Sequence, residues 1–158
     1  MCESTIRRMG QNPETPSTSD REFVHRRVID APRERVFKAF SDPTHLARWW
    51  GPEGFSSTFH DFDLRPGGAW RFDFHGPDGT DYPNESIFVD VVEPELIVIE
   101  HLTDHHFLLT ISFAEHDGMT VVSWRQVFDT AEERERIAPV VVRANEQNLD
   151  RLAAEVKN

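Results

Sequence analysis

The pattern of apolar and polar positions changes repeatedly along the chain, and each change predicts a different element. Residues 1–20 carry few apolar side chains and many Ser, Thr and Pro, a composition typical of a disordered N-terminal tail. From Phe23 the run FVHRRVIDA predicts a strand. The runs PRERVFKAF and SDPTHLARWW then predict two short helices, with Pro32 and Pro43 in their first turns and Asp42 as an N-cap.

After Gly54 the apolar period switches to two, which predicts strands. The clearest is GAWRFDFHG, where charged residues alternate with Trp70, Phe72 and Phe74. In the run YPNESIFVDVVE, the period of two places Ile87, Val89 and Val91 on one face of a strand. With LIVIEHLT, FLLTISF and TVVSWRQVF, the pattern predicts about six consecutive strands joined by short turns, and therefore an antiparallel meander.

The last segment has a helical period with a break. Thr130 and Glu133 match a capping box, and Pro139 predicts a kink or a restart. Asn145 and Asn148 share a face with apolar residues that should meet the sheet. Because a buried amide without a partner costs about 1 to 3 kcal/mol, they should find partners, meet water in a cavity or face an edge.

This order of elements predicts an α+β fold, a curved antiparallel sheet of six to seven strands with two short helices after the first strand and a long C-terminal helix. Residues 21–158 form a single domain in this interpretation. A curved sheet under one helix leaves space in its middle, so we expect a cavity of about 300 Å³ or more between them. Trp49 and Trp50, which end the second short helix, should lie at one mouth of that cavity.

Composition excludes several classes of partner. The net charge is −11, with 17 basic and 28 acidic residues, a balance that repels nucleic acid and anionic lipid. No apolar run reaches the roughly 18 residues of a membrane helix. The cysteine, Cys2, lies in the polar N-terminal segment, so we expect no disulfides. This segment lacks the apolar run that precedes the cleavage site of a secretory signal, so we expect a cytoplasmic protein.

The segments RVIDAPRERVFKAFSDPTHLARWWGPEGF, DLRPGGAWRFDFHGPDG and NLDRLAAEV resemble the bacterial homologues of the activator of Hsp90 ATPase, in the START and Bet v 1-like (SRPBCC) superfamily. The resemblance covers residues 22–156, and the W-W-G-P and R-P-G-G elements are specific to it. It implies a helix-grip fold around a hydrophobic pocket. Many relatives have Gly-Trp where this chain has Ala144-Asn145, which implies a smaller and more polar helix face over that pocket.

We therefore expect a small apolar or amphipathic molecule to bind between the sheet and the C-terminal helix. Aromatic side chains should form the wall of the pocket, and His101 and Asn145 should orient the ligand. The full set of predicted contact residues is Trp49, Trp70, Phe72, Phe74, His101, Phe107, Trp124 and Asn145.

Two other functions stay open at this stage. One is a chaperone-linked or regulatory interaction module, which predicts a filled cavity and a large exposed apolar patch. The other is a polyketide cyclase or dehydratase-type enzyme, which needs a His or carboxylate with a perturbed pKa in the pocket. We assign no catalytic residue and expect no cofactor and no metal, since the spacing of His101, His105 and His106 matches no common metal motif. A homodimer is a further alternative.

Overall fold

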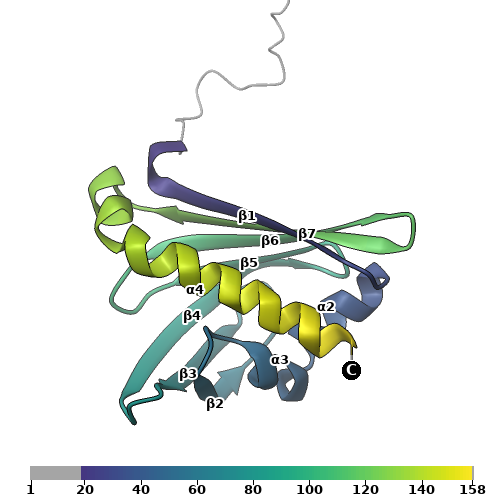
Figure 1. The fold of residues 1–158 in the computed structure, drawn as a ribbon. Helices are drawn as coiled ribbons and strands as arrows, with labels where there is room; N and C mark the ends of the chain where they lie inside the picture. The colour runs from purple at the N-terminus through teal and green to yellow at the C-terminus, as the bar shows by residue number, and fades with distance from the viewer. Residues whose placement is uncertain (1–18, 158) are drawn as a thin grey trace, which may run out of the picture.

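The computed structural model describes residues 19–157, and within them the chain forms one seven-stranded antiparallel sheet that curves around a long helix (Figure 1). The strand order is β1-β7-β6-β5-β4-β3-β2, so the strands from β2 to β7 form a meander and β1 pairs with β7. The elements in chain order are η1 (Ser19–Arg21), β1 (Glu22–Ile29), α2 (Arg33–Ser41), α3 (Pro43–Trp49), β2 (Ser56–Phe62), β3 (Ala69–His75), β4 (Asp81–Val92), β5 (Leu96–His101), β6 (Phe107–His116), β7 (Met119–Phe128) and α4 (Ala131–Lys157). This arrangement confirms the predicted α+β helix-grip fold.

The two short helices follow β1 as predicted. In α3, Pro43 occupies the first turn, and the Asp42 side chain accepts a hydrogen bond of 2.9 Å from the backbone N–H of Thr44. In α2, Pro32 is the N-cap residue and the helix begins at Arg33. Proline suits both places because its missing N–H would have no partner in the first turn of a helix.

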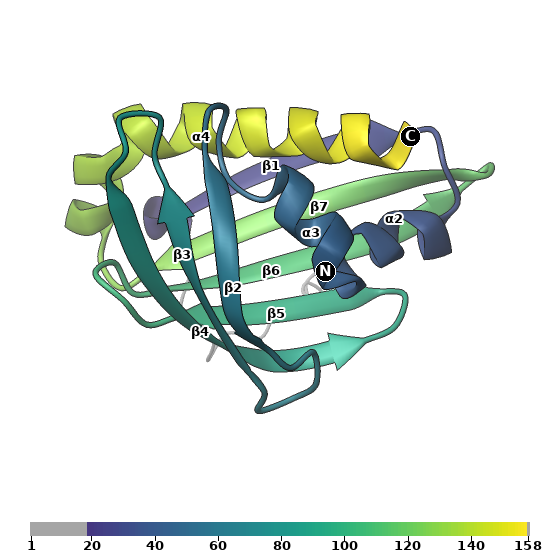
Figure 2. The ribbon, with the colours of Figure 1, turned by 90° about the horizontal axis from the view of Figure 1, so that it is seen from below.

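Helix α4 lies across the concave face of the sheet (Figure 2). Its start is capped by Thr130, whose Oγ1 accepts a hydrogen bond of 3.0 Å from the backbone N–H of Glu133. The helix is continuous through Pro139 and changes direction near it, so the predicted break is a bend (Figure 1). Arg27 of β1 ties the middle of the helix to the sheet edge through a 2.7 Å ion pair with Asp150.

The centre of the molecule is aromatic. The Trp50 ring lies with its centroid 4.9 Å from that of Trp70 and 5.7 Å from that of Trp124. Trp49 packs edge-on against Phe40, with 4.6 Å between centroids, and is 1% exposed. The tryptophan pair therefore lies inside the core and not at an opening, because α4 packs over the end of α3.

Strand β4 places its side chains differently from the predicted pattern. Its pairing with β5 shifts between Phe88 and Asp90, which makes Val89 a bulge. Ile87 and Val89 are exposed on the outer face, at 37% and 46%, whereas Val91 packs against the core. The three residues therefore do not share one face, because one extra residue in a strand reverses the faces beyond it.

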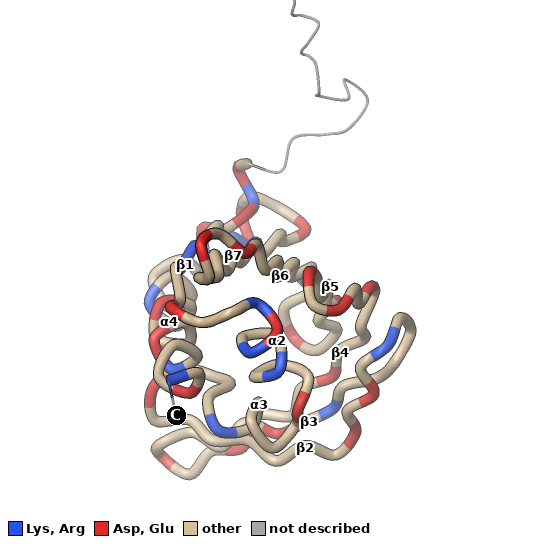
Figure 3. The backbone as a smooth tube through the Cα atoms, turned by 90° about the vertical axis from the view of Figure 1, so that its right-hand side faces the viewer, with Lys and Arg blue, Asp and Glu red and all other residues tan. Residues whose placement is uncertain are grey.

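Lys and Arg are interleaved with Asp and Glu around the outside of the fold (Figure 3). Within the described residues, no helix combines the length and apolarity needed to cross a membrane. The predicted N-terminal tail falls largely outside the described residues; of its members, Ser19 and Asp20 belong to η1.

Candidate ligand-binding site

A cavity of about 210 Å³ lies on the inner face of the sheet, beneath the turn that follows α3. Its lining comes from the four strands β3 to β6 and from that turn, and consists of Trp50, Trp70, Phe72, Phe74, Asn84, Ser86, Ile99, His101, Phe107 and Leu109. The cavity is smaller than the about 300 Å³ expected for a ligand pocket. The reason is the bulk of the buried indole rings around Trp50, which fill the remainder of the space.

The strand register explains how these side chains meet. Side chains that alternate along a strand share a face, so Trp70, Phe72 and Phe74 of β3 all point inward. On β4, Ser86 pairs with Trp70 on one side and with His101 on the other. Directly paired residues in an antiparallel sheet have Cβ atoms about 4.5 to 5.5 Å apart, so these three side chains are neighbours on the cavity wall.

The cavity has a buried end and an accessible end. The lining residues Trp50, Trp70 and Ser86 are at most 9% exposed. At the other end the lining residues are partly exposed; these are Phe74, Asn84, His101 and Phe107. Solvent therefore reaches the cavity where β3 and β5 end and where β4 and β6 begin.

His101 is the ionisable residue of this lining, and its contacts set its chemistry. Its ring stacks on Phe107 with a centroid distance of 4.5 Å and an angle of 8°. Nδ1 lies 2.7 Å from the backbone oxygen of His105, and Nε2 lies 2.8 Å from Oδ1 of Asn84. Burial lowers the pKa of His101, because removal from water disfavours the imidazolium, although the bond to His105 opposes the shift.

The predicted contact residues divide into two groups. Those that line the cavity are Trp70, Phe72, Phe74, His101 and Phe107, and those that lie outside its lining are Trp49, Trp124 and Asn145. The indole N–H of Trp49 donates a 2.9 Å hydrogen bond to the backbone oxygen of Ala39. Asn145 donates one of 3.0 Å to Oε1 of Gln126, which satisfies a buried amide without a ligand.

The sequence interpretation missed half of the lining, namely Trp50, Asn84, Ser86, Ile99 and Leu109. Leu109 follows the period-two pattern of β6, which was sufficient to find it, whereas β5 has four consecutive apolar residues and its pattern did not mark the face of Ile99. Asn84 and Ser86 lie on the same inner face of β4 as Phe88, but polar residues of a strand are ordinarily assigned to the solvent face.

Three buried indole N–H groups are without hydrogen-bond partners in the described part of the chain, those of the cavity-lining Trp50 and Trp70 and that of Trp124, which packs against Trp50. An unpaired buried donor costs about 1 to 3 kcal/mol, so such groups are uncommon in a native core. The clustering of three such N–H groups around Trp50 indicates that the residues here are not optimised for stability alone.

The loop 102–106 borders the accessible end and is fastened to its surroundings by histidines. Nδ1 of His105 lies 2.5 Å from Oε2 of Glu133 in the first turn of α4. His106 contacts both Glu100 and Asp129 at 2.8 Å, and these hydrogen bonds raise the pKa of His106. Within residues 19–157, no group of three or more His, Cys, Asp or Glu side chains is suited to hold a metal ion.

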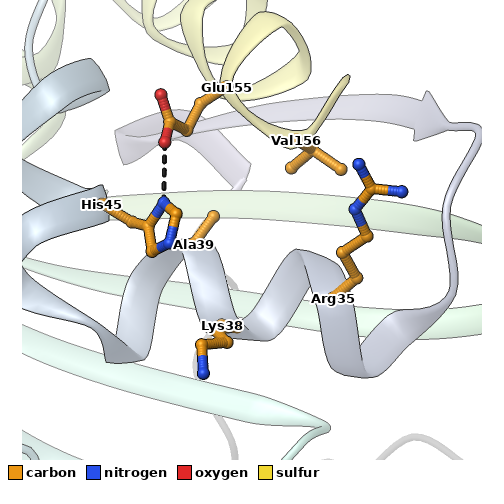
Figure 4. A pocket seen from close by; sticks show the side chains of 6 residues that line it. All are labelled: Arg35, Lys38, Ala39, His45, Glu155 and Val156. Carbon is orange, nitrogen blue, oxygen red and sulfur yellow. Dashed lines mark hydrogen bonds and ion pairs between the residues drawn. The ribbon is translucent and has the colours of Figure 1, made fainter. Parts of the chain in front are cut away.

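A second hollow, of about 160 Å³, lies where α2 and α3 meet the end of α4 (Figure 4). Its wall includes His45, whose Nδ1 lies 2.7 Å from Oε2 of Glu155. Burial opposes ionisation of Glu155, but hydrogen bonds from His45 and Arg48 offset it and lower the pKa of this carboxyl. The hollow contains none of the predicted contact residues, and its ion pairs join α3 to α4.

The sequence matches the family model described as "Activator of Hsp90 ATPase homolog 1-like protein" over residues 30–157. No curated protein matches it.

Several solved bacterial structures share the fold. Protein NE0264 from Nitrosomonas europaea superposes with a TM-score of 0.82 at 18% identity, covering 90% of this chain and 98% of that one. Protein CV1439 from Chromobacterium violaceum has a TM-score of 0.77 at 29% identity, with 87% and 98% covered. An AHSA1-like protein from Aeromonas hydrophila has a TM-score of 0.71 at 21% identity, with 86% and 92% covered.

Proposed function

We propose that this chain, which belongs to the Activator of Hsp90 ATPase homolog 1-like family, binds a small apolar or amphipathic molecule in the cavity between Trp50 and the sheet. The observation that carries the proposal is the cavity itself, which combines aromatic walls with a few polar groups at an accessible end. Flat aromatic walls favour a ligand that contains an aromatic ring.

The volume limits the size of the ligand. A dry protein cavity of about 150 Å³ accepts benzene. A cavity of about 210 Å³ therefore accommodates one ring with small substituents, unless the walls move apart. The ligand class that fits best is a monocyclic aromatic compound.

The test is titration of the full chain with p-xylene, followed by ligand-observed NMR. Leu109 and Leu108 are adjacent on β6, but Leu109 lines the cavity and is 3% exposed, whereas Leu108 faces outward and is 38% exposed. Leu109→Phe should block the cavity and abolish saturable binding, whereas Leu108→Phe should leave it unchanged. Absence of saturable binding to the wild type, or equal binding by both variants, would contradict the proposal.

A chaperone-linked role is the second candidate, and the observation that favours it is the outer face of the sheet. Within the described residues this face exposes apolar side chains on β1 and β4, namely Val24, Val28, Ile87 and Val89. A mixture of this chain with Hsp90 should then show an altered ATPase rate, and Val24→Ser with Val28→Ser should reverse that effect. An unaltered rate would exclude this role for the face.

A further inference from the structure

Asn84 and His101 at the accessible end, with the buried Ser86 paired to His101, form a polar corner of an otherwise apolar cavity. We propose that this corner receives the carboxylate of a small aromatic acid, and that binding is accompanied by uptake of a proton on His101. The inference rests on the proposed function, because it assigns the ligand class of the same cavity.

The hydrogen bonds around His101 are complete only when its ring carries two protons. Nδ1 faces the backbone oxygen of His105 at 2.7 Å, so this nitrogen must donate. The Asn84 amide is oriented by its own Nδ2, which donates a 2.9 Å hydrogen bond to the backbone oxygen of Tyr82. Oδ1 of Asn84 therefore faces Nε2 of His101 at 2.8 Å, and a neutral ring protonated on Nδ1 would place two acceptors against each other.

The surroundings of His101 nevertheless favour the neutral ring. Burial against Phe107 lowers the pKa of His101. The titratable groups whose charge acts on the ring all belong to the following loop and are Asp104, His105 and His106; the two histidines disfavour the imidazolium and Asp104 favours it. From the side of α4, Glu133 contacts His105 and not His101.

His101 is thus left with a conflict that the protein does not resolve by itself. Among the described residues, no carboxylate forms an ion pair with His101. The neutral ring loses a hydrogen bond, and the charged ring lacks a counter-ion in a largely apolar cavity. A ligand carboxylate beside the ring supplies the missing counter-charge, so that the doubly protonated ring can keep both of its hydrogen bonds, to His105 and to Asn84.

Ser86 supplies an independent hydrogen-bond donor. Its side chain is 3% exposed, lines the cavity and pairs directly with His101 across the sheet. The Ser86 hydroxyl forms no hydrogen bond within residues 19–157. The hydroxyl is therefore available as a donor to a group bound in the cavity. One carboxylate can accept a hydrogen bond from the Ser86 hydroxyl while its charge offsets that of the His101 imidazolium.

The experiment compares 4-methylbenzoate with 4-methylbenzamide, which have the same shape but differ in charge. Isothermal titration calorimetry at about pH 7.5, in two buffers of different ionisation enthalpy, measures both affinity and protons taken up. We expect the carboxylate to bind at least about tenfold more tightly than the amide. We also expect proton uptake with the carboxylate and none with the amide.

The variants assign the effect to particular residues. His101→Gln should remove the proton uptake and the preference for the carboxylate, and Ser86→Ala should reduce the preference without removing the uptake. His116→Gln, which changes an exposed histidine at the end of β6 opposite to Phe107, should leave both unchanged. Binding of p-xylene by His101→Gln shows that this variant is folded and its cavity intact.

Each outcome decides one of the two proposals. If p-xylene binds the wild type but the carboxylate and amide bind equally, or if proton uptake persists in His101→Gln, this inference is wrong and the proposed function stands. If p-xylene, the carboxylate and the amide all fail to bind the wild type, the proposed function is wrong as well.

Discussion

The backbone N–H of Gly51 donates a 3.1 Å hydrogen bond to Oδ1 of Asn148, across 97 residues of sequence. Arg151, one turn further along α4, donates bonds of 2.9 Å to the backbone oxygens of Gly51 and Pro52. These contacts hold the W-W-G-P turn against the C-terminal helix. Because Trp50 directly precedes Gly51, they also position one wall of the cavity.

Asn148→Leu should lower the free energy of unfolding by about 1 to 3 kcal/mol, because it leaves the buried Gly51 N–H without an acceptor. Urea unfolding followed by tryptophan fluorescence measures this change. The matched control is Gln147→Ala, since Oε1 of Gln147 accepts an exposed bond of 3.2 Å from the N–H of Glu53 in the same turn. The control should change stability by less than about 0.5 kcal/mol, and equal losses would disprove the role of Asn148.

Gly51→Ala should be more destabilising than Gly79→Ala. Both glycines have positive φ, +105° and +86°, so alanine strains the backbone at either site by about 1 to 2 kcal/mol. At Gly51 a Cβ would also lie 2.7 Å from Cε1 of Phe74, whereas at Gly79 it would meet no atom within 4 Å. Thermal unfolding of both variants isolates the steric effect, and equal melting temperatures would contradict the contact.

Arg151→Lys should destabilise the fold by about 1 kcal/mol or more, although the charge is kept. The guanidinium donates to three backbone oxygens, those of Arg48, Gly51 and Pro52, and an ammonium cannot reproduce this planar fork. Arg65→Lys is the control, because Arg65 makes an exposed ion pair with Asp63. Urea unfolding should show a clear loss for the first variant only; a similar loss for both would contradict the expectation.

The ion pairs of His106 should stabilise the fold only at the acidic end of the neutral range. Hydrogen bonds to Glu100 and Asp129 raise the pKa of His106 in the folded state. This contribution is complete below the unfolded pKa of about 6.5 and is lost as pH rises through the folded value.

Glu100→Gln should therefore lower the pKa of His106 in an NMR titration. The stability difference from wild type should fade as pH rises, and it should stay below about 1 kcal/mol because both side chains are exposed to screening by solvent. A difference that grows with pH would contradict this account.

Local patterns in the sequence determined most of the fold. The period-two runs predicted the meander and placed Trp70, Phe72 and Phe74 inside, because alternation depends on neighbouring residues alone. Asp42 and Pro43 predicted the start of α3 for the same reason. A proline in a helical segment, by contrast, can either bend the helix or end it, and the structure shows α4 continuous through Pro139.

Tertiary structure decided which residues share the cavity. The bulge at Val89 is a property of the pairing between β4 and β5, and no local signal marks it. Trp50 lies at the cavity only because Asn148 and Arg151, far along the chain, hold the following turn. Ser86 and His101 meet because their strands pair in that register. The sequence by itself thus determined the elements and their inward faces, whereas long-range pairing, which depends on residues distant in sequence, decided the composition of the site.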